Sequence, residues 1–299
     1  EAKKGQWNEA LQRKELTRQV TIVFYEMMYL KEKEKLLLKS DSIYSEFLRK
    51  TALRFDKGES NILEKATAEN QSGQIKIQLL ELQSDYKIIQ SQLKYLLNTD
   101  KDFVPVSDKL KMDFTENLDK NAIGNQPSIK LFEQEVNSSK AEISLEKSKK
   151  LPELIGGVYY QTFKTNAEFQ NSYNGVYGQF GVAIPLFNAA INNKKKALEI
   201  NTQIAENNLN NEKLKLESKN QELVQEYKKQ KETIAYFESQ ALKNVDLVTK
   251  AANDKFINGD INYLEWVMLI NQSTGIQSDY IEAVRKLNIS IIEINALTN

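Results

Sequence analysis

The chain has 299 residues and a formal net charge of zero, because its 41 Lys and Arg balance its 41 Asp and Glu. A neutral chain has no overall field to attract nucleic acid, so a nucleic-acid-binding protein is disfavoured. The absence of His and Cys excludes Cys and His zinc sites, thiol nucleophiles and Ser-His-Asp catalysis. We therefore expect no enzyme, no cofactor, no metal site and no nucleic-acid partner.

Long helices are expected at the start of the chain, because only 11 Gly and 4 Pro interrupt the 299 residues. One helical pattern covers residues 6–54 and a second one ends near Leu97. Gly58 between them suits a left-handed helix C-cap, and Asn61 suits the N-cap of the next helix. The second helix has a coiled-coil seam at Leu82, Tyr86, Ile89, Leu93 and Leu96. Residues 1–98 are thus predicted to form a first helical hairpin.

Residues 99–127 contain Pro105, Gly124 and Pro127 and have mixed polarity, which indicates a connector with at most short helices. A short helix is expected from Ser128 to about Lys149. A different composition follows, since residues 151–187 hold five of the eleven Gly between two prolines. Residues 128–187 are therefore predicted to be a short helix followed by a β-hairpin.

The second half of the β region alternates with period two, which is typical of a strand with two different faces. One face carries large apolar side chains, and the other carries Gln, Gly and Ala. A two-stranded hairpin is not stable alone in water, and this apolar face suits lipid outside a barrel shared between chains. A small soluble β element packed on helices is the alternative. The predicted lipid-facing residues are Val176, Phe180, Val182, Ile184 and Leu186.

Residues 188–299 are predicted to be a second helical hairpin. Nothing in the sequence breaks a helix from Asn188 to about Asn253, and a last helix follows a turn at residues 255–262. The two turns are copies of each other, because RFDKGESNILE at 54–64 matches KFINGDINYLE at 255–265 with a constant offset of 201 residues. This match indicates a duplicated helical hairpin, and it is too long and occurs too few times for a solenoid repeat.

The chain resembles the TolC family of outer-membrane efflux proteins over essentially its whole length. The resemblance rests on LPEL at 151–154, on GVAIPLFN at 181–188, where a strand leads into a very long helix, and on the turn at 256–265. It implies a mainly α fold of long antiparallel helical hairpins, with the β-hairpin contributed to an outer-membrane β-barrel. The implied protein is a homotrimer in its full-length form, and its helices lie in the periplasm of a Gram-negative cell.

The resemblance also implies a function as a passive export duct, a channel component that works with a periplasmic adaptor and an inner-membrane pump. The last 70 residues are similar to family members that serve heavy-metal pumps of the resistance-nodulation-division (RND) type, which suggests cation efflux. Family members have two β-hairpins, and this sequence contains only the second one. We therefore expect the chain to be a truncated piece or one part of a fusion.

The resemblance places the two turns at the tip that meets the adaptor; ordinary helix caps with a packed Phe are the alternative. The predicted docking residues are Phe55, Gly58, Glu59, Asn61, Leu63, Phe256, Gly259, Asp260, Asn262 and Leu264. A ring of acids at a narrow entrance would attract cations, whereas solvated or capping acids are the simpler interpretation. The entrance acids proposed besides Glu59 and Asp260 are Asp56, Glu64, Asp254 and Glu265.

Two other classes of protein remain open at this point. A periplasmic adaptor, or membrane fusion protein, is also built on a helical hairpin, but it would need β-rich domains beside that hairpin. A cytosolic coiled-coil scaffold would have no use for Gly- and aromatic-rich strands between Pro152 and Pro185.

Overall fold

The computed structural model describes residues 2–58, 61–106, 109–114, 120–163 and 173–298. The chain divides into two compact units, and each is described by itself. The smaller unit comprises residues 1–8 and 127–215, and the larger unit comprises residues 9–126 and 216–299.

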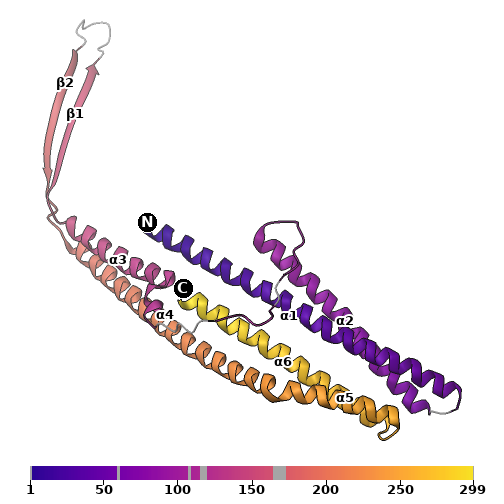
Figure 1. Cartoon of the computed structure of the whole chain (residues 1–299). Coiled ribbons are helices and arrows are strands. Elements are labelled where there is room, and N and C mark those ends of the chain that lie inside the picture. The colour runs from indigo at the N-terminus through magenta and orange to yellow at the C-terminus, as the bar shows by residue number, and fades with distance from the viewer. Residues whose placement is uncertain (1, 59–60, 107–108, 115–119, 164–172, 299) are drawn as a thin grey trace. The chain divides into compact units, whose positions relative to one another are not determined.

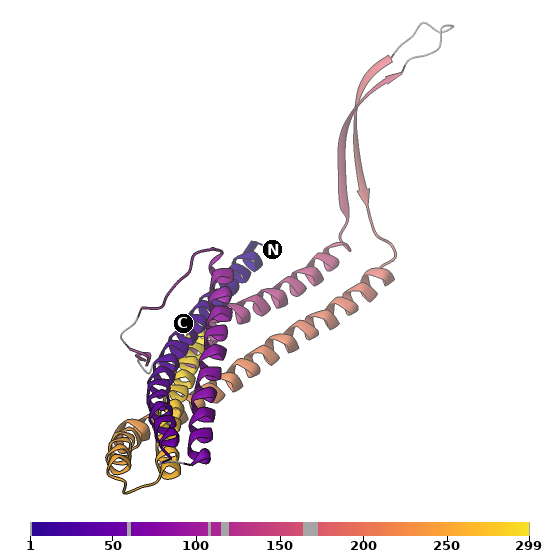
Figure 2. The ribbon, with the colours of Figure 1, turned by 90° about the vertical axis from the view of Figure 1, so that its right-hand side faces the viewer.

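Long helices make up most of the larger unit (Figure 1). The ends of α1 and α5 that lead into the two interhelical turns lie at the same end of this unit in both views (Figures 1 and 2). None of the described helices has a stretch long and apolar enough to span a membrane. The elements that lie wholly or partly in this unit are α1 (Ala2–Asp56), α2 (Ile62–Leu97), the 3-10 helix η1 (Lys120–Asn125), α4 (Ala189–Tyr236), the π-helix η2 (Phe237–Ala241), α5 (Leu242–Asn258) and α6 (Tyr263–Thr298).

The long helix after the β region begins at Ala189, one residue after the predicted position. It is not one uninterrupted α-helix, because the five-residue π-helix Phe237–Ala241 separates α4 from α5. The sequence contains no Gly or Pro at this point, so the change of helix type has no signal in residue composition. Periodicity could not reveal it either, since the apolar seam continues through Ile234, Ala241 and Val245, all of which are buried.

The core of the larger unit forms where α1 packs against both α2 and α6. Near the turns, the buried cluster combines Leu37 and Phe47 of α1 with Ala68 of α2 and Ile270 of α6. Farther along, Met27 of α1 packs with the α2 seam that the sequence predicted. Val284, Leu287 and Ile291 of α6 belong to a second buried cluster, which includes the end of α4. The α2 seam that the sequence predicted therefore faces the core.

The smaller unit places α3 (Pro127–Ser148) alongside the first part of α4 (Figure 2). Ile129 of α3 is 1% exposed and Leu198 of α4 is 7% exposed. Lys140 and Glu206 form an ion pair across the two helices at 2.8 Å. The chain then enters the β-hairpin, whose strands are β1 (Glu153–Phe163) and β2 (Tyr173–Ala183).

The two strands pair antiparallel, with Leu154 opposite Val182 and Tyr160 opposite Val176. The predicted hairpin is thus present, although the loop between the strands lies mostly outside the described residues. Because β2 ends at Ala183, the predicted lipid-facing residues Ile184 and Leu186 come after the strand rather than within it. Pro185 cannot donate a ladder hydrogen bond, which agrees with an early end of pairing.

Candidate docking site at the helix turns

Both interhelical turns use a left-handed glycine, as the sequence predicted. Gly58 has φ +75° and Gly259 has φ +80°. The Gly259 N–H donates to the carbonyl oxygen of Phe256, and the next N–H, of Asp260, donates to Lys255 at 2.8 Å. These bonds satisfy carbonyl groups that the end of α5 leaves open. The Gly58 N–H donates to Phe55 in the same way at 2.9 Å, so the two turns share one backbone design.

The asparagines after the glycines cap the next helices. The Asn61 side chain accepts a hydrogen bond from the Glu64 N–H at 2.9 Å. Asn262 accepts from the Glu265 N–H at 3.0 Å, and the Glu265 carboxylate accepts from the Asn262 N–H at 2.9 Å. This reciprocal pair is a capping box, which satisfies two otherwise unpaired N–H groups. Both asparagines and Glu265 therefore have a structural task at the turns.

Several large apolar side chains at the turns are exposed to solvent. Leu63 is 73% exposed and its counterpart Leu264 is 65% exposed, while Ile257 reaches 76%. Exposed leucines at equivalent positions of both copies contribute little to this chain's own core, so they are available to a partner. Gly58, Asn61, Gly259, Asp260 and Asn262 are exposed as well, and Glu59 lies outside the described residues.

The two phenylalanines of the turns differ in their surroundings. Phe55 is half-buried, and the Lys65 ammonium lies 5.0 Å from its ring centroid. Phe256 packs against Phe47 and Trp266, with ring centroids 5.7 Å and 5.4 Å apart. Phe256 thus packs against the core. For this one residue, the observation agrees with the alternative interpretation, an ordinary helix cap with a packed Phe.

An aromatic cluster that was not predicted from the sequence lies behind the second turn. Tyr263 and Trp266 both stack on Phe47 of α1, at 4.6 Å and 4.8 Å. The indole N–H of Trp266 donates to Asn253 at 2.8 Å, and burial raises the pKa of Tyr263 to about 12. The apolar spacing of residues 263, 266 and 270 was a helical signal that could have revealed this face. The cluster fixes the second turn onto α1.

Acidic and basic side chains alternate at the turns. Asp56, Asp254 and Asp260 are exposed, and Glu64 is partly buried. Lys57 and Lys255 are exposed beside them, so the charge at this end is mixed within the single chain. The structure therefore brings the predicted acids that it describes to one end of the larger unit, together with positive charges that the acid-ring hypothesis did not include.

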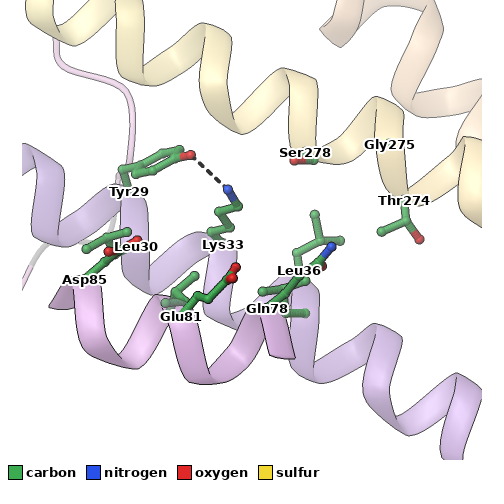
Figure 3. A pocket seen from close by; sticks show the side chains of 12 residues that line it. Tyr29, Leu30, Lys33, Leu36, Gln78, Glu81, Asp85, Thr274, Gly275 and Ser278 are labelled. Atoms are coloured by element: carbon green, nitrogen blue, oxygen red, sulfur yellow. Dashed lines mark hydrogen bonds between the residues drawn. The ribbon is translucent and has the colours of Figure 1, made fainter. Parts of the chain in front are cut away.

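An open groove of about 480 Å³ lies between α2 and α6, with α1 at its base (Figure 3). Buried leucines, among them Leu30 and Leu82, line it. Lys33 projects into it and donates a 3.3 Å hydrogen bond to the Tyr29 hydroxyl. Further lining residues are Leu36, Leu37, Gln78, Glu81, Asp85, Thr274, Gly275 and Ser278. Among the residues that the structure describes, no group of three or more acids is placed to hold a metal ion.

In the β-hairpin, the apolar face is fully open to solvent in the single chain. Phe180 is 94% exposed, and Val176 and Val182 are 70% and 61% exposed. The strand register adds Leu154 and Tyr160 of β1 to the same face. On the opposite face, the rings of Tyr159 and Tyr177 stack at 5.4 Å.

A comparison with protein-family models gives no match, and neither does a comparison with curated protein sequences. Solved structures do match. The outer-membrane channel OprN has a TM-score of 0.86 at 13% identity, covering 99% of this chain and 68% of that one. The Campylobacter jejuni CmeC outer membrane channel gives 0.84 at 12% identity, covering 99% and 65%. CusC, described through its folding and transmembrane channel formation, gives 0.75 at 16% identity, covering 99% and 73%.

The chain therefore has the fold of the TolC-family outer-membrane channels, with long helical hairpins and an antiparallel β-hairpin. The resemblance stated from the sequence is confirmed at the level of the fold. The structures of OprN and CmeC are described as those of outer-membrane channels. The chain spans between 65% and 73% of the length of the structures it matches.

Proposed function

We propose that this protein is an outer-membrane channel component of a tripartite efflux system. It acts as a passive duct, with its helices in the periplasm, that docks onto a periplasmic adaptor and works with an inner-membrane RND pump. The observation that carries the proposal is the fold that 99% of the chain shares with solved outer-membrane channels. The exposed, duplicated leucines Leu63 and Leu264 support docking at the turns, because the turns are capped within the chain while these side chains stay uncovered.

The β-hairpin is proposed to enter the outer membrane. Its exposed apolar face suits lipid contact, with Val176, Phe180 and Val182 on β2 and Leu154 and Tyr160 on β1. In hydrocarbon, the outer edges of both strands must be paired by other strands, so a closed barrel requires further strands. We assign these strands to the other hairpin that the resemblance implies for the full-length form and to the other copies in a full-length homotrimer.

The outer face of α2 also supports self-association, because it exposes apolar side chains. Ile77, Leu80, Ile88 and Tyr95 follow helical spacing along one stripe and are each more than half exposed. A stripe of this spacing on a helix suits a neighbouring helix. A second copy of the chain is the partner that the proposed trimer would supply.

Docking is tested by replacing both leucines in the protein expressed in cells, as Leu63→Asp with Leu264→Asp. Export of a fluorescent dye should fall at least tenfold, since two charges would be buried in the adaptor contact. Circular dichroism should stay unchanged, because neither side chain is in the core. Leu145→Asp is the matched control, since Leu145 on α3 is 64% exposed and lies in the other unit. Normal export by the double variant would favour ordinary helix caps.

Export of metal cations is the finer form of the proposal, and it rests on the exposed carboxylates of Asp56, Asp254 and Asp260. In the same assay, replacing all three with Asn should lower metal export and leave dye export intact. An equal loss of metal export and dye export would mean that these acids act in docking. No loss of either activity would mean that they are simply solvated.

A further inference from the structure

Lysine side chains gather where the β-hairpin leaves the helices of the smaller unit. Residues 146–153 and 184–199, on either side of the hairpin, contain six lysines and only three glutamates, although the chain as a whole is neutral. We call the six lysines the basic cluster. They are Lys147, Lys149 and Lys150 before the hairpin and Lys194, Lys195 and Lys196 after it, and all except the partly buried Lys195 are exposed.

The structure brings the two runs of lysine together. The first run lies at the end of α3 and the second lies near the start of α4, and the hairpin leaves from these neighbouring helix ends (Figures 1 and 2). The Lys150 ammonium donates a 2.5 Å hydrogen bond to the side-chain oxygen of Asn192, which is 42 positions away in the sequence. Lysines from two helices therefore form one positively charged surface.

Helix stabilisation accounts for only one of the two runs. The C-terminus of a helix carries a partial negative charge, so the lysines at the end of α3 are favourable there. The N-terminus carries a partial positive charge, and α4 has no acidic residue in its first turn to balance it. Residues 194–196 follow directly after this positive end, so the dipole of α4 does not favour them. An anion outside the chain would favour both runs.

The chain neutralises only part of the charge of the basic cluster. Lys149 forms an ion pair with Glu146 at 2.7 Å, and Lys195 forms one with Glu199 at 3.1 Å. Among the described residues, no ion pair involves Lys147, Lys194 or Lys196. Like charges that are held close together repel each other, and an approaching anion would relieve this repulsion.

Large apolar side chains next to the basic cluster are exposed. Leu151 is 66% exposed and Phe187 is 91% exposed, and both lie in the sequence between the lysines and the strands. Apolar strands, exposed apolar residues and then lysines thus follow one another in the order of hydrocarbon, interface and headgroups in a lipid leaflet. Lysine suits the last position, because its apolar stem can lie along the interface while its ammonium reaches the headgroups.

We propose that the basic cluster binds the phosphate groups of anionic phospholipids at the membrane surface where the β-hairpin enters. This inference rests on the proposed entry of the hairpin into the outer membrane. It adds a lipid-binding surface outside the strands, and it sets the depth to which the hairpin inserts. Each lysine beside an anionic bilayer raises the affinity about fivefold, so the six together favour anionic over neutral lipid.

The lipid preference is tested by flotation of the purified protein with two kinds of vesicle. One kind consists of phosphatidylcholine, and the other is an equal mixture of phosphatidylcholine and phosphatidylglycerol. The protein should bind the mixed vesicles more tightly, and high salt should remove the preference. Replacing the three lysines without an ion pair, as Lys147→Gln with Lys194→Gln and Lys196→Gln, should lower the affinity for the mixed vesicles at least tenfold. The affinity for phosphatidylcholine should not change.

The matched control removes the same charge from other exposed positions on α4 and α5, as Lys213→Gln with Lys228→Gln and Lys243→Gln. A loss as large as that of the cluster variant would overturn the cluster as the binding site. Equal affinity of the parent protein for both kinds of vesicle would overturn the headgroup contact and leave the entry of the hairpin standing. Binding to neither kind would overturn the entry of the hairpin as well.

A second measurement tests the depth of the basic cluster. The chain has no Cys, so Asn193→Cys and Asn208→Cys each place one fluorescent dye at an exposed position of α4. The second position is about 22 Å farther along the helix, at 1.5 Å per residue. A nitroxide carried on the lipid headgroup should quench the dye at position 193 strongly and the dye at position 208 weakly. Equal quenching at the two positions would overturn the placement of the cluster at the headgroups.

Discussion

The two interhelical turns share a backbone design but differ in how they are anchored. Each has a left-handed glycine and an asparagine cap. Behind the second turn, Tyr263 and Trp266 stack on Phe47 of α1. The positions 201 residues earlier hold Ile62, which is 59% exposed, and Lys65, which covers Phe55. The capping residues are thus common to both copies, whereas the side chains that anchor a turn to a neighbouring helix are not.

This difference teaches which part of a duplicated hairpin is constrained by local structure. Any copy needs a residue that tolerates positive φ and a side chain that caps the next helix, because these requirements come from the backbone itself. Anchoring depends on the neighbouring helix, and among the described residues the aromatic cluster on α1 lies behind the second turn. We therefore expect equal effects from changes to the glycines and unequal effects from changes to the anchoring positions.

The largest effect is expected from Trp266→Ala. Trp266 is 4% exposed, contacts three aromatic rings and donates to Asn253, so its removal should cost about 3–5 kcal/mol of unfolding free energy. The counterpart Lys65→Ala should cost about 0.5 kcal/mol or less, as is usual for surface positions. Urea unfolding followed by circular dichroism measures both. Equal losses from the two variants would mean that both turns are anchored to the same degree.

An intermediate loss of unfolding free energy is expected from Gly58→Ala and Gly259→Ala. A Cβ atom would meet nothing within 4 Å at either position, so the cost is backbone strain alone, about 1–2 kcal/mol at each turn. Asn should cost less than Ala, because Asn98 already adopts φ +48° at the end of α2. The same unfolding measurement applies. A cost at Gly259 much above that at Gly58 would show that anchoring changes the strain as well.

The smallest effect is expected at alkaline pH. The pKa of Tyr263 in the folded chain is raised to about 12, above the value near 10 of an unfolded tyrosine. The group therefore contributes stability that is fully present below pH 10 and is lost as the pH rises toward 12. Tyr263→Phe should make the decline of unfolding free energy between pH 10 and 12 shallower. An unchanged slope would contradict this, and Ile62→Val at the first turn is the non-titrating control.

Sequence reasoning predicted the helical hairpins because seams, caps and turn glycines are local properties. The spacing of Leu82 and Leu93 was sufficient to place their face of α2 in the core, and both are buried. The end of β2 at Ala183 was not predicted, since alternation continues through Leu186 although pairing does not. The role of Phe256 also depended on a distant residue, Phe47, which sequence spacing could not associate with it.

By itself, the sequence determined the elements, their order and the chemistry of both turns. The reason is that the 3.6-residue period of helices, the two-residue period of strands and the need for glycine at positive φ are properties of a few neighbouring residues. Only the tertiary structure decided which turn is anchored by aromatic rings, which acids cap a helix and where the long helix becomes a π-helix. Asn288 illustrates the reason, because its buried side chain bonds to the backbone of Leu110 and Met112. These residues lie more than a hundred positions away, and no local pattern encodes such contacts.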